Sequence, residues 1–342
     1  MLYKIAFIAN NPGGLNSILP VAKKFNAALG RDIEIDFFCS FEARTYMYPQ
    51  KFNVIFMDEN SNETCVVKLQ PKKYQCLIAA TSITGNLEKT FVRVFKKNGV
   101  KTYSILDHSK LLLERYTDKA ELDSLPDKIY SPDLKTKKKL KELSLGQTTV
   151  TVIHNPAFDA LFDREIKSNK KKIHDQNYII FASEPFSSDF PETSSCSELT
   201  SLDYLCKALK LANENFMLIV RPHPREEKKK FLPVLKKHGI PYKFDEAIDK
   251  VPGLLSSNAV YGFDSNLLVE SSILGIPTYS IQINCSHEFD IDFNYYGINQ
   301  IINFKDLIDS IEHPSQRVNE TFFDKKSSAY IYNDVLNYIS IN

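Results

Sequence analysis

The chain has 342 residues, 43% of them hydrophobic and 25% charged, which is enough to build two globular domains of about 150 residues each. Its 43 basic and 42 acidic residues leave a formal net charge of +1. This balance excludes the broad basic field that nucleic-acid binding requires, so no nucleic-acid partner is expected. No run approaches the roughly 20 apolar residues that span a bilayer, and the apolar start turns polar too soon for a signal peptide.

The cysteines lie far apart in the sequence, at positions 39, 65, 76, 196, 206 and 285. None of their spacings matches a metal site or a redox motif. Cys39 and Cys76 adjoin strand-like apolar runs. Buried, reduced thiols are therefore expected, and with them a cytoplasmic location.

Short apolar runs alternate with helical patterns along the whole chain. In the first half, strands are predicted at residues 4–9, 33–39, 53–57, 76–80, 101–106, 128–130 and 149–154. In the second half, they are predicted at residues 178–182, 217–220, 242–244, 259–261 and 278–281. Between several of these runs, helices are predicted, for example at residues 86–97, 133–143 and 201–212.

This alternation predicts right-handed βαβ crossovers and two Rossmann-like, doubly wound α/β domains that face a cleft. We expect an N-terminal domain at residues 1–166 and a C-terminal domain at residues 173–327, joined by the charged segment 167–172. Residues 328–342 are expected to form a helix that crosses back to the first domain. Ligands of such sheets bind beyond the carboxyl ends of the strands, so functional residues are sought in the loops that follow strands.

The first such loop is Asn10-Asn11-Pro12-Gly13-Gly14. Two glycines let the backbone approach a ligand closely, and the next helix offers free N–H groups to an anion. The pattern is neither G-x-G-x-x-G nor a P-loop, which disfavours dinucleotide binding and NTP hydrolysis. An ordinary tight turn explains the same residues equally well.

Asp107 and His108 end a later strand, and Arg115 follows on the next helix. Asp107 or His108 can act as a general base, and Arg115 can form a forked contact with a carboxylate or a phosphate. The alternative is a structural loop that caps the helix. Glu88 and Asn155 occupy loops after other strands, and for Glu88 the alternative is an exposed acid favoured by the helix dipole.

Arg221-Pro222-His223-Pro224 directly follows an apolar strand and is the most specific motif in the chain. The two prolines hold the segment extended and fix the directions of Arg221 and His223. A guanidinium and an imidazole there suit a diphosphate, whose developing charge they can neutralise without a metal ion. A structural histidine in a proline-rich turn is the alternative. Ser183 and Glu184 follow the first strand of this half and are weaker candidates.

Another strand meets a helix at Asp264-Ser265-Asn266, and Glu270 lies one turn into that helix. Asp264, Ser265 and Asn266 are all residue types that favour the N-cap position of a helix. The same helix start is an anion site, and Glu270 can accept the hydroxyl groups of a ribose. Capping and ligand binding are compatible here, so both interpretations stand.

Two charged features are interpreted as exposed surface. The acidic segment Asp290-Ile291-Asp292 is more typical of a solvated face than of a metal site, so no metal is expected. The lysine-rich runs at residues 135–141 and 228–230 are expected on exposed helix faces. Peripheral contact of these runs with an anionic inner membrane is a hypothesis.

Together these motifs resemble those of the GT-B superfamily of glycosyltransferases over nearly the whole chain. In the first half, the likeness is to a recurrent segment of bacterial surface-polysaccharide proteins, carried by Asp107-His108, Arg115, Leu125-Pro126-Asp127 and Asn155-Pro156. In the second half, the motifs from Arg221 to Pro224 and from Asp264 to Glu270 are similar to those of two groups. One group is the bacterial sialyltransferases and Kdo transferases, which use CMP-sugars, and the other is the UDP-N-acetylglucosamine 2-epimerases.

The resemblance implies a metal-independent glycosyltransferase that needs no cofactor and acts in bacterial surface-polysaccharide or glycoconjugate synthesis. Its partners would be a nucleotide sugar, expected to be a CMP-activated acidic sugar such as a nonulosonic acid or Kdo, and a glycan or lipid-linked acceptor. The implied donor-binding residues are Ser183, Glu184, Arg221, His223, Asp264, Ser265, Asn266 and Glu270. The implied acceptor-binding residues are Asn11, Gly13, Gly14, Glu88, Arg115 and Asn155, and the implied catalytic residues are Asp107, His108 and His223.

Three other functions are compatible with the same motifs. The first is a UDP-N-acetylglucosamine 2-epimerase, and the second is a CDP-glycerol-type polyol-phosphate transferase. The third is a catalytically inactive binding subunit.

Overall fold

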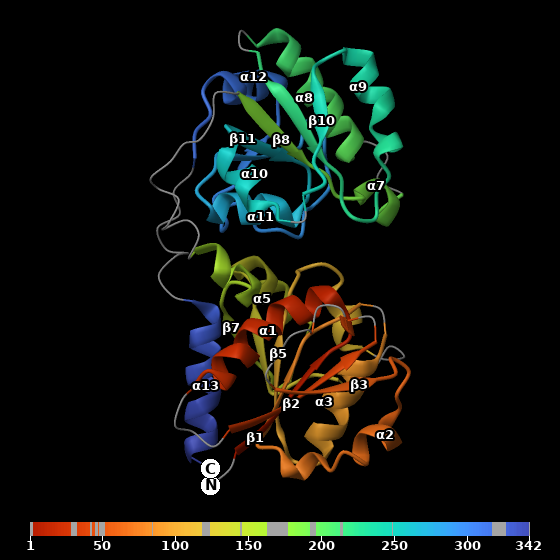
Figure 1. The fold of residues 1–342 in the computed structure, drawn as a ribbon, viewed down its shortest axis with the longest axis vertical. Helices are drawn as coiled ribbons and strands as arrows, with labels where there is room; N and C mark the ends of the chain where they lie inside the picture. Colours follow the sequence, from red (N-terminus) through yellow and green to blue (C-terminus); the bar gives the residue numbers. More distant parts are fainter. Residues whose placement is uncertain are drawn as a thin grey trace. The chain divides into compact units, whose positions relative to one another are not determined.

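We describe the fold from a computed structural model of the chain. The structure describes residues 3–28, 33–41, 43–44, 47, 52–83, 85–117, 124–143, 146–162, 177–191, 196–212, 215–247, 249–316 and 326–341. The chain forms two compact units (Figure 1). Unit 1 comprises Met1–Asp159 and Asp324–Asn342, and unit 2 comprises Ala160–Phe323. The predicted linker at 167–172 and the predicted boundaries at 166 and 173 lie outside the described residues.

Unit 1 is built on a seven-stranded parallel sheet in the order β3-β2-β1-β4-β5-β6-β7. Its strands are β1 (Tyr3–Ala9), β2 (Ile33–Ser40), β3 (Asn53–Met57), β4 (Cys76–Ala79), β5 (Lys101–Ile105), β6 (Lys128–Ser131) and β7 (Thr149–Val152). All seven strands that the sequence predicts in this half are confirmed. They read as nearly continuous apolar runs because both faces of a parallel sheet are covered.

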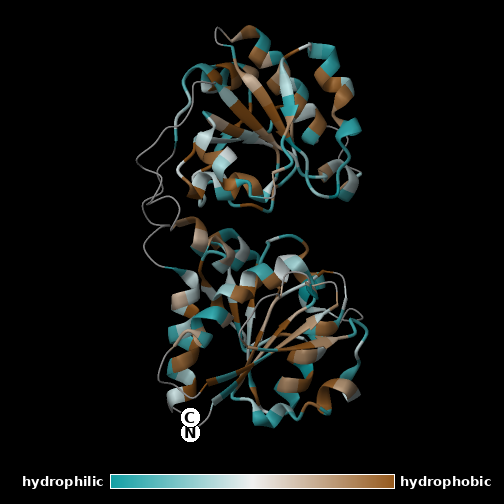
Figure 2. Ribbon diagram, viewed as in Figure 1, coloured by the Kyte–Doolittle hydropathy of each residue, from teal (hydrophilic) through white to brown (hydrophobic). Residues whose placement is uncertain are grey.

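Helices pack on both faces of this sheet. They are α1 (Pro12–Asn26), α2 (Glu63–Val67), α3 (Leu87–Lys97), α4 (Leu112–Tyr116), α5 (Leu134–Glu142) and α13 (Ser327–Ile341), with short 3₁₀ turns η2 (Pro71–Lys73) and η3 (Pro156–Phe158). Successive residues of β1 enter different cores: Phe7 packs with α1 and α13, whereas Ile8 packs with α3. Figure 2 shows the hydrophobic residues concentrated in the strands and on the inner faces of the helices.

Helix α13 returns the chain to unit 1, where Ile331 and Val335 join the core beside α1. At the start of α13, the carboxylate of Asp159 accepts the N–H groups of Ser327 (3.0 Å) and Ser328 (2.9 Å). Burial alone would raise the pKa of Asp159, but the hydrogen bonds from His154 and Ser328 outweigh it and lower this pKa overall. Asp159 therefore ties the end of the first segment of unit 1 to the start of the second.

Unit 2 has a six-stranded parallel sheet in the order β10-β9-β8-β11-β12-β13. Its strands are β8 (Tyr178–Ala182), β9 (Met217–Arg221), β10 (Tyr242–Phe244), β11 (Ala259–Gly262), β12 (Thr278–Ile281) and β13 (Asn299–Ile301). Five are predicted by the sequence and confirmed. Strand β13 is not predicted, because its three residues are partly polar and show no apolar run.

The helices of unit 2 are α7 (Phe186–Asp189), α8 (Glu198–Leu211), α9 (Leu232–His238), α10 (Val251–Ser256), α11 (Asn266–Ile273) and α12 (Phe304–Glu312), with the 3₁₀ turn η4 (Lys228–Lys230). Residues of α8, α9 and α12 share one core on one face of the sheet. Helix α8 begins earlier than the sequence predicts, because Ser197 and Thr200 form a capping box at its start.

In each sheet the chain order reverses at one place. The reversal lies between β1 and β4 in unit 1 and between β8 and β11 in unit 2. Ligands of doubly wound sheets bind at this place, beyond the carboxyl ends of the strands. The fold therefore directs attention to the loops after these four strands. None of the described helices has the length and apolar character that crossing a bilayer requires.

Candidate functional site

The carboxylate of Asp107, just beyond β5, is held by two side chains of unit 1. Its Oδ1 accepts hydrogen bonds from Nη1 of Arg115 (2.6 Å) and from Oγ1 of Thr81 (3.0 Å). Arg115 is 6% exposed, and its guanidinium also donates through Nε to the carbonyl of Lys110 (2.8 Å). Among the described residues, none donates a hydrogen bond to Oδ2 of Asp107. The carboxylate is thus fixed in orientation while one oxygen can still accept a proton.

His108 is placed to donate a hydrogen bond rather than to accept a proton. Its Nδ1 accepts the backbone N–H of Lys110 (3.0 Å), so the neutral ring carries its hydrogen on Nε2. Burial and the nearby charges of Lys110 and Arg115 hold the pKa of His108 well below 6.5. The ring is therefore neutral at pH 7, and of the two candidate bases only Asp107 has an accepting atom available.

The segment Pro12-Gly13-Gly14 is the first turn of α1, not the loop that the sequence suggests. Asn11 caps this helix, because its Oδ1 accepts the N–H of Gly14 (2.8 Å). A β-carbon on Gly14 would lie 2.9 Å from the β-carbon of Ala80. The glycine at this position is therefore explained by the close packing of α1 against the end of β4.

Glu88 is a buried residue, and the alternative of an exposed acid at a helix start is wrong. It is 3% exposed, and its two oxygens accept hydrogen bonds from N–H of Asn10 (2.7 Å) and from Oγ of Ser82 (2.7 Å). Burial raises the pKa of Glu88. The carboxyl group thus bridges the loop after β1 and the loop after β4. Glu88 therefore stabilises the carboxyl-terminal edge of the sheet. Asn155 similarly supports the Asp107 loop, because its Nδ2 donates to the carbonyl of Asp107 (3.2 Å).

In unit 2, three of the predicted residues gather where the sheet order reverses. Ser183 follows β8, and Ser265 caps α11 after β11 by accepting the N–H of Leu267 (3.3 Å). Asn266 is exposed at the first position of that helix. The hydroxyl of Ser183 is buried, with the residue 4% exposed, and has no hydrogen-bond partner among the described residues. Glu184 and Asp264 lie in the same two loops, partly buried and buried respectively.

Two predicted donor-binding side chains are instead engaged by other residues of unit 2. The guanidinium of Arg221 pairs with Asp245 (2.5 Å) and donates to the carbonyl of Ala247 (2.9 Å), which directs it towards β10 and away from β8. The carboxylate of Glu270 pairs with Nζ of Lys250 (2.5 Å). The sequence does not reveal these partners, because they lie about 20 or more residues away in segments without a motif.

His223 lies in the loop after β9, at the same carboxyl-terminal edge of the sheet as Ser183 after β8. Its backbone N–H donates to Glu226 (2.9 Å), and its Nδ1 accepts the N–H of Arg225 (3.2 Å). The neutral ring therefore carries its hydrogen on Nε2, as in His108. Strand β8 lies between β9 and β11, so these two strands are about 10 Å apart, and the loops of His223 and Ser265 follow them at the same edge of the sheet.

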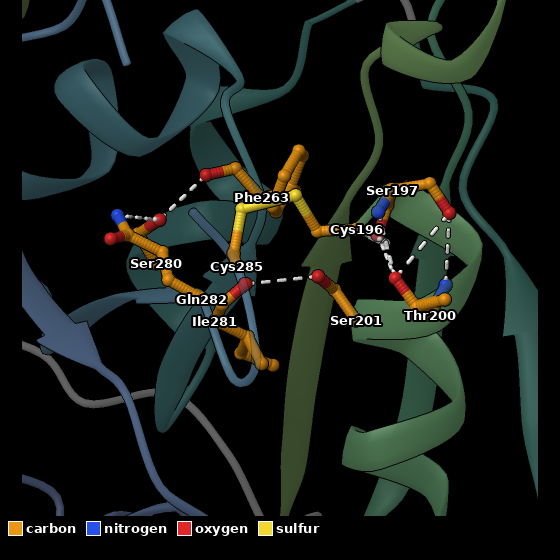
Figure 3. Close-up of a disulfide and its surroundings, with 9 residues drawn as sticks. All are labelled: Cys196, Ser197, Thr200, Ser201, Phe263, Ser280, Ile281, Gln282 and Cys285. Carbon is orange, nitrogen blue, oxygen red and sulfur yellow. Dashed lines mark hydrogen bonds between the residues drawn. A yellow bond between two sulfur atoms is a disulfide. The ribbon is translucent and has the colours of Figure 1, made fainter. Parts of the chain in front are cut away.

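A disulfide joins Cys196, just before α8, to Cys285, just after β12, with their α-carbons 5.3 Å apart (Figure 3). Next to it, Ser201 donates to the carbonyl of Ile281 (2.9 Å) and Ser280 donates to the carbonyl of Phe263 (2.6 Å). The disulfide thus links the segment between β8 and α8 to the loop after β12, and β11 lies between these two strands in the sheet.

The expectation of buried, reduced thiols is correct for three of the six cysteines. Cys39, Cys76 and Cys206 are buried and free. Cys65 is free but exposed, and Cys196 and Cys285 are oxidised. Their partnership is not visible in the sequence, because 89 positions separate the two residues.

The acidic segment belongs to no cluster of metal ligands among the described residues, and membrane contact by the lysine-rich runs stays a hypothesis. Among the described residues, no group of three or more His, Cys, Asp and Glu side chains is arranged to hold a metal ion. Lys228, Lys229 and Lys230 each form an ion pair with an acidic residue, so this run is less suited to an anionic surface than its sequence suggests. Lys135–Lys141 belongs to α5, whose lysines are partly or fully exposed.

No protein-family model and no curated protein match the sequence, but solved structures match the whole chain. Anabaena HepE, in complex with UDP and glucose, is 12% identical, with a TM-score of 0.61, 99% of this chain covered and 100% of that chain. S. aureus MnaA, in a structure with UDP, is 12% identical, with a TM-score of 0.66 and coverage of 100% and 98%. The UDP-N-acetylglucosamine 2-epimerase of Rickettsia bellii is 16% identical, with a TM-score of 0.61 and coverage of 100% and 98%.

The chain has the GT-B fold. Its two parallel-sheet units match these neighbours over their full length, and the neighbours are GT-B glycosyltransferase-like proteins. The expectation of two doubly wound α/β domains is confirmed.

Proposed function

We propose that the chain is a metal-independent glycosyltransferase that takes a sugar from a nucleotide donor bound by unit 2. The acceptor, a glycan or a lipid-linked glycan, would bind unit 1. The GT-B fold supports this proposal, as do the UDP and UDP-glucose complexes of the structural neighbour HepE. A role in bacterial surface glycans belongs to the same proposal. The cytoplasmic location expected from the sequence loses the support of reduced thiols, because Cys196 and Cys285 are joined in a disulfide.

The hydroxyl of Ser183 carries the donor assignment. A buried hydroxyl without a partner is unfavourable by about 1–3 kcal/mol, and a ligand oxygen can remove that penalty. This hydroxyl lies at the reversal point of the sheet, beside the helix start at Ser265 and Asn266. A phosphate there would meet the hydroxyl of Ser183 and the N-terminal end of α11. His223, with hydrogen on Nε2, would add a donor from the next strand.

Asp107 is the general base in this proposal. Its Oδ2 would accept the proton of the attacking acceptor hydroxyl, while Arg115 and Thr81 hold Oδ1. Arg115 and His108 would act as positioning residues.

We propose UDP as the nucleotide of the donor, because two of the structural neighbours described above hold UDP. A CMP-activated acidic sugar is the donor that the sequence motifs suggest, on the argument that Arg115 meets its carboxylate. That argument loses support, because the guanidinium of Arg115 is buried and bonded to Asp107, Thr81 and Lys110.

Nucleotide binding by the full chain tests the proposal. UDP, CMP, GDP and CDP would be compared by thermal shift, and UDP is expected to give the largest increase in melting temperature. Ser183→Ala should weaken UDP binding about tenfold and leave the unliganded protein equally or more stable, because an unpaired buried hydroxyl has been removed. Asp107→Asn should keep UDP binding and lose transfer. The absence of any shift with all four nucleotides would overturn the donor assignment.

A 2-epimerase is the second candidate, favoured by the full-length likeness to the R. bellii enzyme. An epimerase would convert UDP-N-acetylglucosamine without any acceptor. Proton NMR of the sugar after incubation with UDP-N-acetylglucosamine alone separates the two functions, since a transferase leaves it unepimerised.

A further inference from the structure

The carboxyl ends of β2 and β3 border a pocket that none of the assignments above uses. It has a volume of about 390 Å³ and is lined by Ser40, Phe41, Asp58, Glu59 and Asn60. Small-molecule sites typically measure about 300–1,000 Å³, so this pocket suits one small ring rather than an extended chain. We call it the Phe41 pocket.

Phe41 is 62% exposed, although large aromatic residues are usually buried. The ring stacks on Phe56, with centroids 5.9 Å apart and an angle of 17° between the rings. The guanidinium of Arg44 in turn lies 5.7 Å from the centroid of Phe56. One face of the Phe41 ring is therefore held by Phe56, and the residue remains exposed enough for a ligand to stack on it. The face of such a ring carries partial negative charge and attracts the C–H groups of a ligand.

The polar lining of the pocket consists of hydrogen-bond acceptors. Asp58 and Glu59 are exposed, and neither forms an ion pair with a described residue. Oδ1 of Asp58 accepts the N–H of Asn60 (2.8 Å), which orients the carboxylate and leaves its other oxygen for a ligand. Ionised carboxylates accept hydrogen bonds from hydroxyl groups. Among the described residues, no basic side chain lines the pocket, so the charges of Asp58 and Glu59 disfavour a phosphate or an acidic sugar there.

A hydrogen-bonded path joins the Phe41 pocket to the reversal point of the unit 1 sheet. Ser40 Oγ donates to the carbonyl of Asn10, and the N–H of Asn10 donates to the buried carboxyl group of Glu88. The pocket therefore lies at the same edge of the sheet as Asp107, and β1 and β4 lie between β2, which borders the pocket, and β5, which precedes Asp107.

We propose that the Phe41 pocket is a subsite for an uncharged sugar ring of the acceptor. The ring stacks its C–H face on Phe41 and donates hydroxyl hydrogens to Asp58 and Glu59. This inference deepens the proposed function, on which it rests for the role of the sugar as acceptor. The binding of a sugar by the pocket is argued from Phe41, Asp58 and Glu59 alone and does not depend on the proposed function.

Saturation-transfer NMR on the full chain tests the subsite. The probes are the methyl glycosides of glucose, galactose, mannose and N-acetylglucosamine, with methyl glucuronide as the charged comparison. At least one neutral probe should receive saturation on its ring C–H protons. Phe41→Ala should weaken its binding at least about tenfold, and Asp58→Asn should weaken it as well. Val67→Ala is the matched control, because Val67 is an exposed apolar residue of unit 1 outside the pocket.

The same samples are titrated with UDP, which separates this inference from the proposed function. Binding of UDP without binding of any neutral probe overturns the subsite and leaves the donor assignment standing. Binding of a probe with equal affinity in Phe41→Ala, or tighter binding of the glucuronide than of the glucoside, also overturns it. Binding of a neutral probe that depends on Phe41, without UDP binding, keeps the pocket as a sugar site and overturns the transferase.

Discussion

Gly13, in the first turn of α1, lies against the carboxylate of Asp107 beyond β5: a β-carbon on Gly13 would come within 3.3 Å of Oδ2. This is the oxygen that no described residue bonds. The helix thus leaves room beside the proposed base only because residue 13 has no side chain.

Gly13→Ala should therefore lower transfer without destabilising the fold. The added methyl group would crowd Oδ2 of Asp107, whereas alanine in a helix is favoured over glycine by about 1 kcal/mol. We expect transfer to fall at least about tenfold and the thermal shift with UDP to stay unchanged. Gly253→Ala in α10 is the control, because a β-carbon there has no neighbour within 4 Å. Equal transfer by wild type and Gly13→Ala would contradict the role of Oδ2.

Glu88→Gln should make the stability of unit 1 less dependent on pH. The pKa of Glu88 is raised by burial, so the folded state binds this proton more tightly than the unfolded state does. The free energy of unfolding of the wild type should then fall as pH rises from the ordinary pKa of 4.5 through the raised value. The amide of glutamine has no such loss.

Urea unfolding of both proteins between pH 4 and pH 8 measures this difference. As pH rises, the free energy of unfolding of the Gln variant should increase relative to that of the wild type. The exposed Glu114→Gln serves as control and should follow the wild type. Parallel curves for the wild type and Glu88→Gln would show that Glu88 does not titrate differently in the fold.

Loss of the Cys196–Cys285 bond should destabilise unit 2. The bond closes a loop over a sequence separation of 89, and cross-links of this kind contribute about 2–4 kcal/mol, chiefly by restricting the unfolded chain. Replacing both cysteines with serine should lower the urea midpoint of the unit 2 transition. Dithiothreitol should lower it equally in the wild type and leave the double variant unchanged.

Cys65→Ser provides the comparison for this experiment, because Cys65 is exposed and forms no disulfide. Alkylation under denaturing, non-reducing conditions followed by mass spectrometry would count the free thiols directly, including the buried ones. Labelling of Cys196 and Cys285 in that experiment would rule out the bond.

Chelation should leave transfer intact. The proposed donor site would hold the phosphate with hydrogen bonds from His223, Ser183 and the start of α11, and no metal cluster is found among the described residues. We expect less than about a twofold change in rate after dialysis against EDTA, by comparison with the much larger losses typical of metal enzymes. A large loss that Mg²⁺ or Mn²⁺ restores would overturn the metal-independent mechanism.

Local patterns of residues were enough to predict the elements of the fold and the loops that carry polar residues. Every strand it predicts is present, because a strand buried on both faces needs a continuous apolar run, and that signal is local. The placement of Asp107, Ser183 and Ser265 after strands could be predicted for the same reason. Of the described strands, only β13 is not predicted, since its three partly polar residues carry no such signal.

The order of the strands, and with it the reversal points at β1/β4 and β8/β11, depends on how the strands pair in three dimensions. So do the partners of the candidate residues: Arg115 with Asp107, Arg221 with Asp245, and Cys196 with Cys285. A guanidinium or a thiol in a sequence is compatible with many partners. Which partner it meets depends on how distant segments pack side by side, and no local pattern of residues encodes that packing.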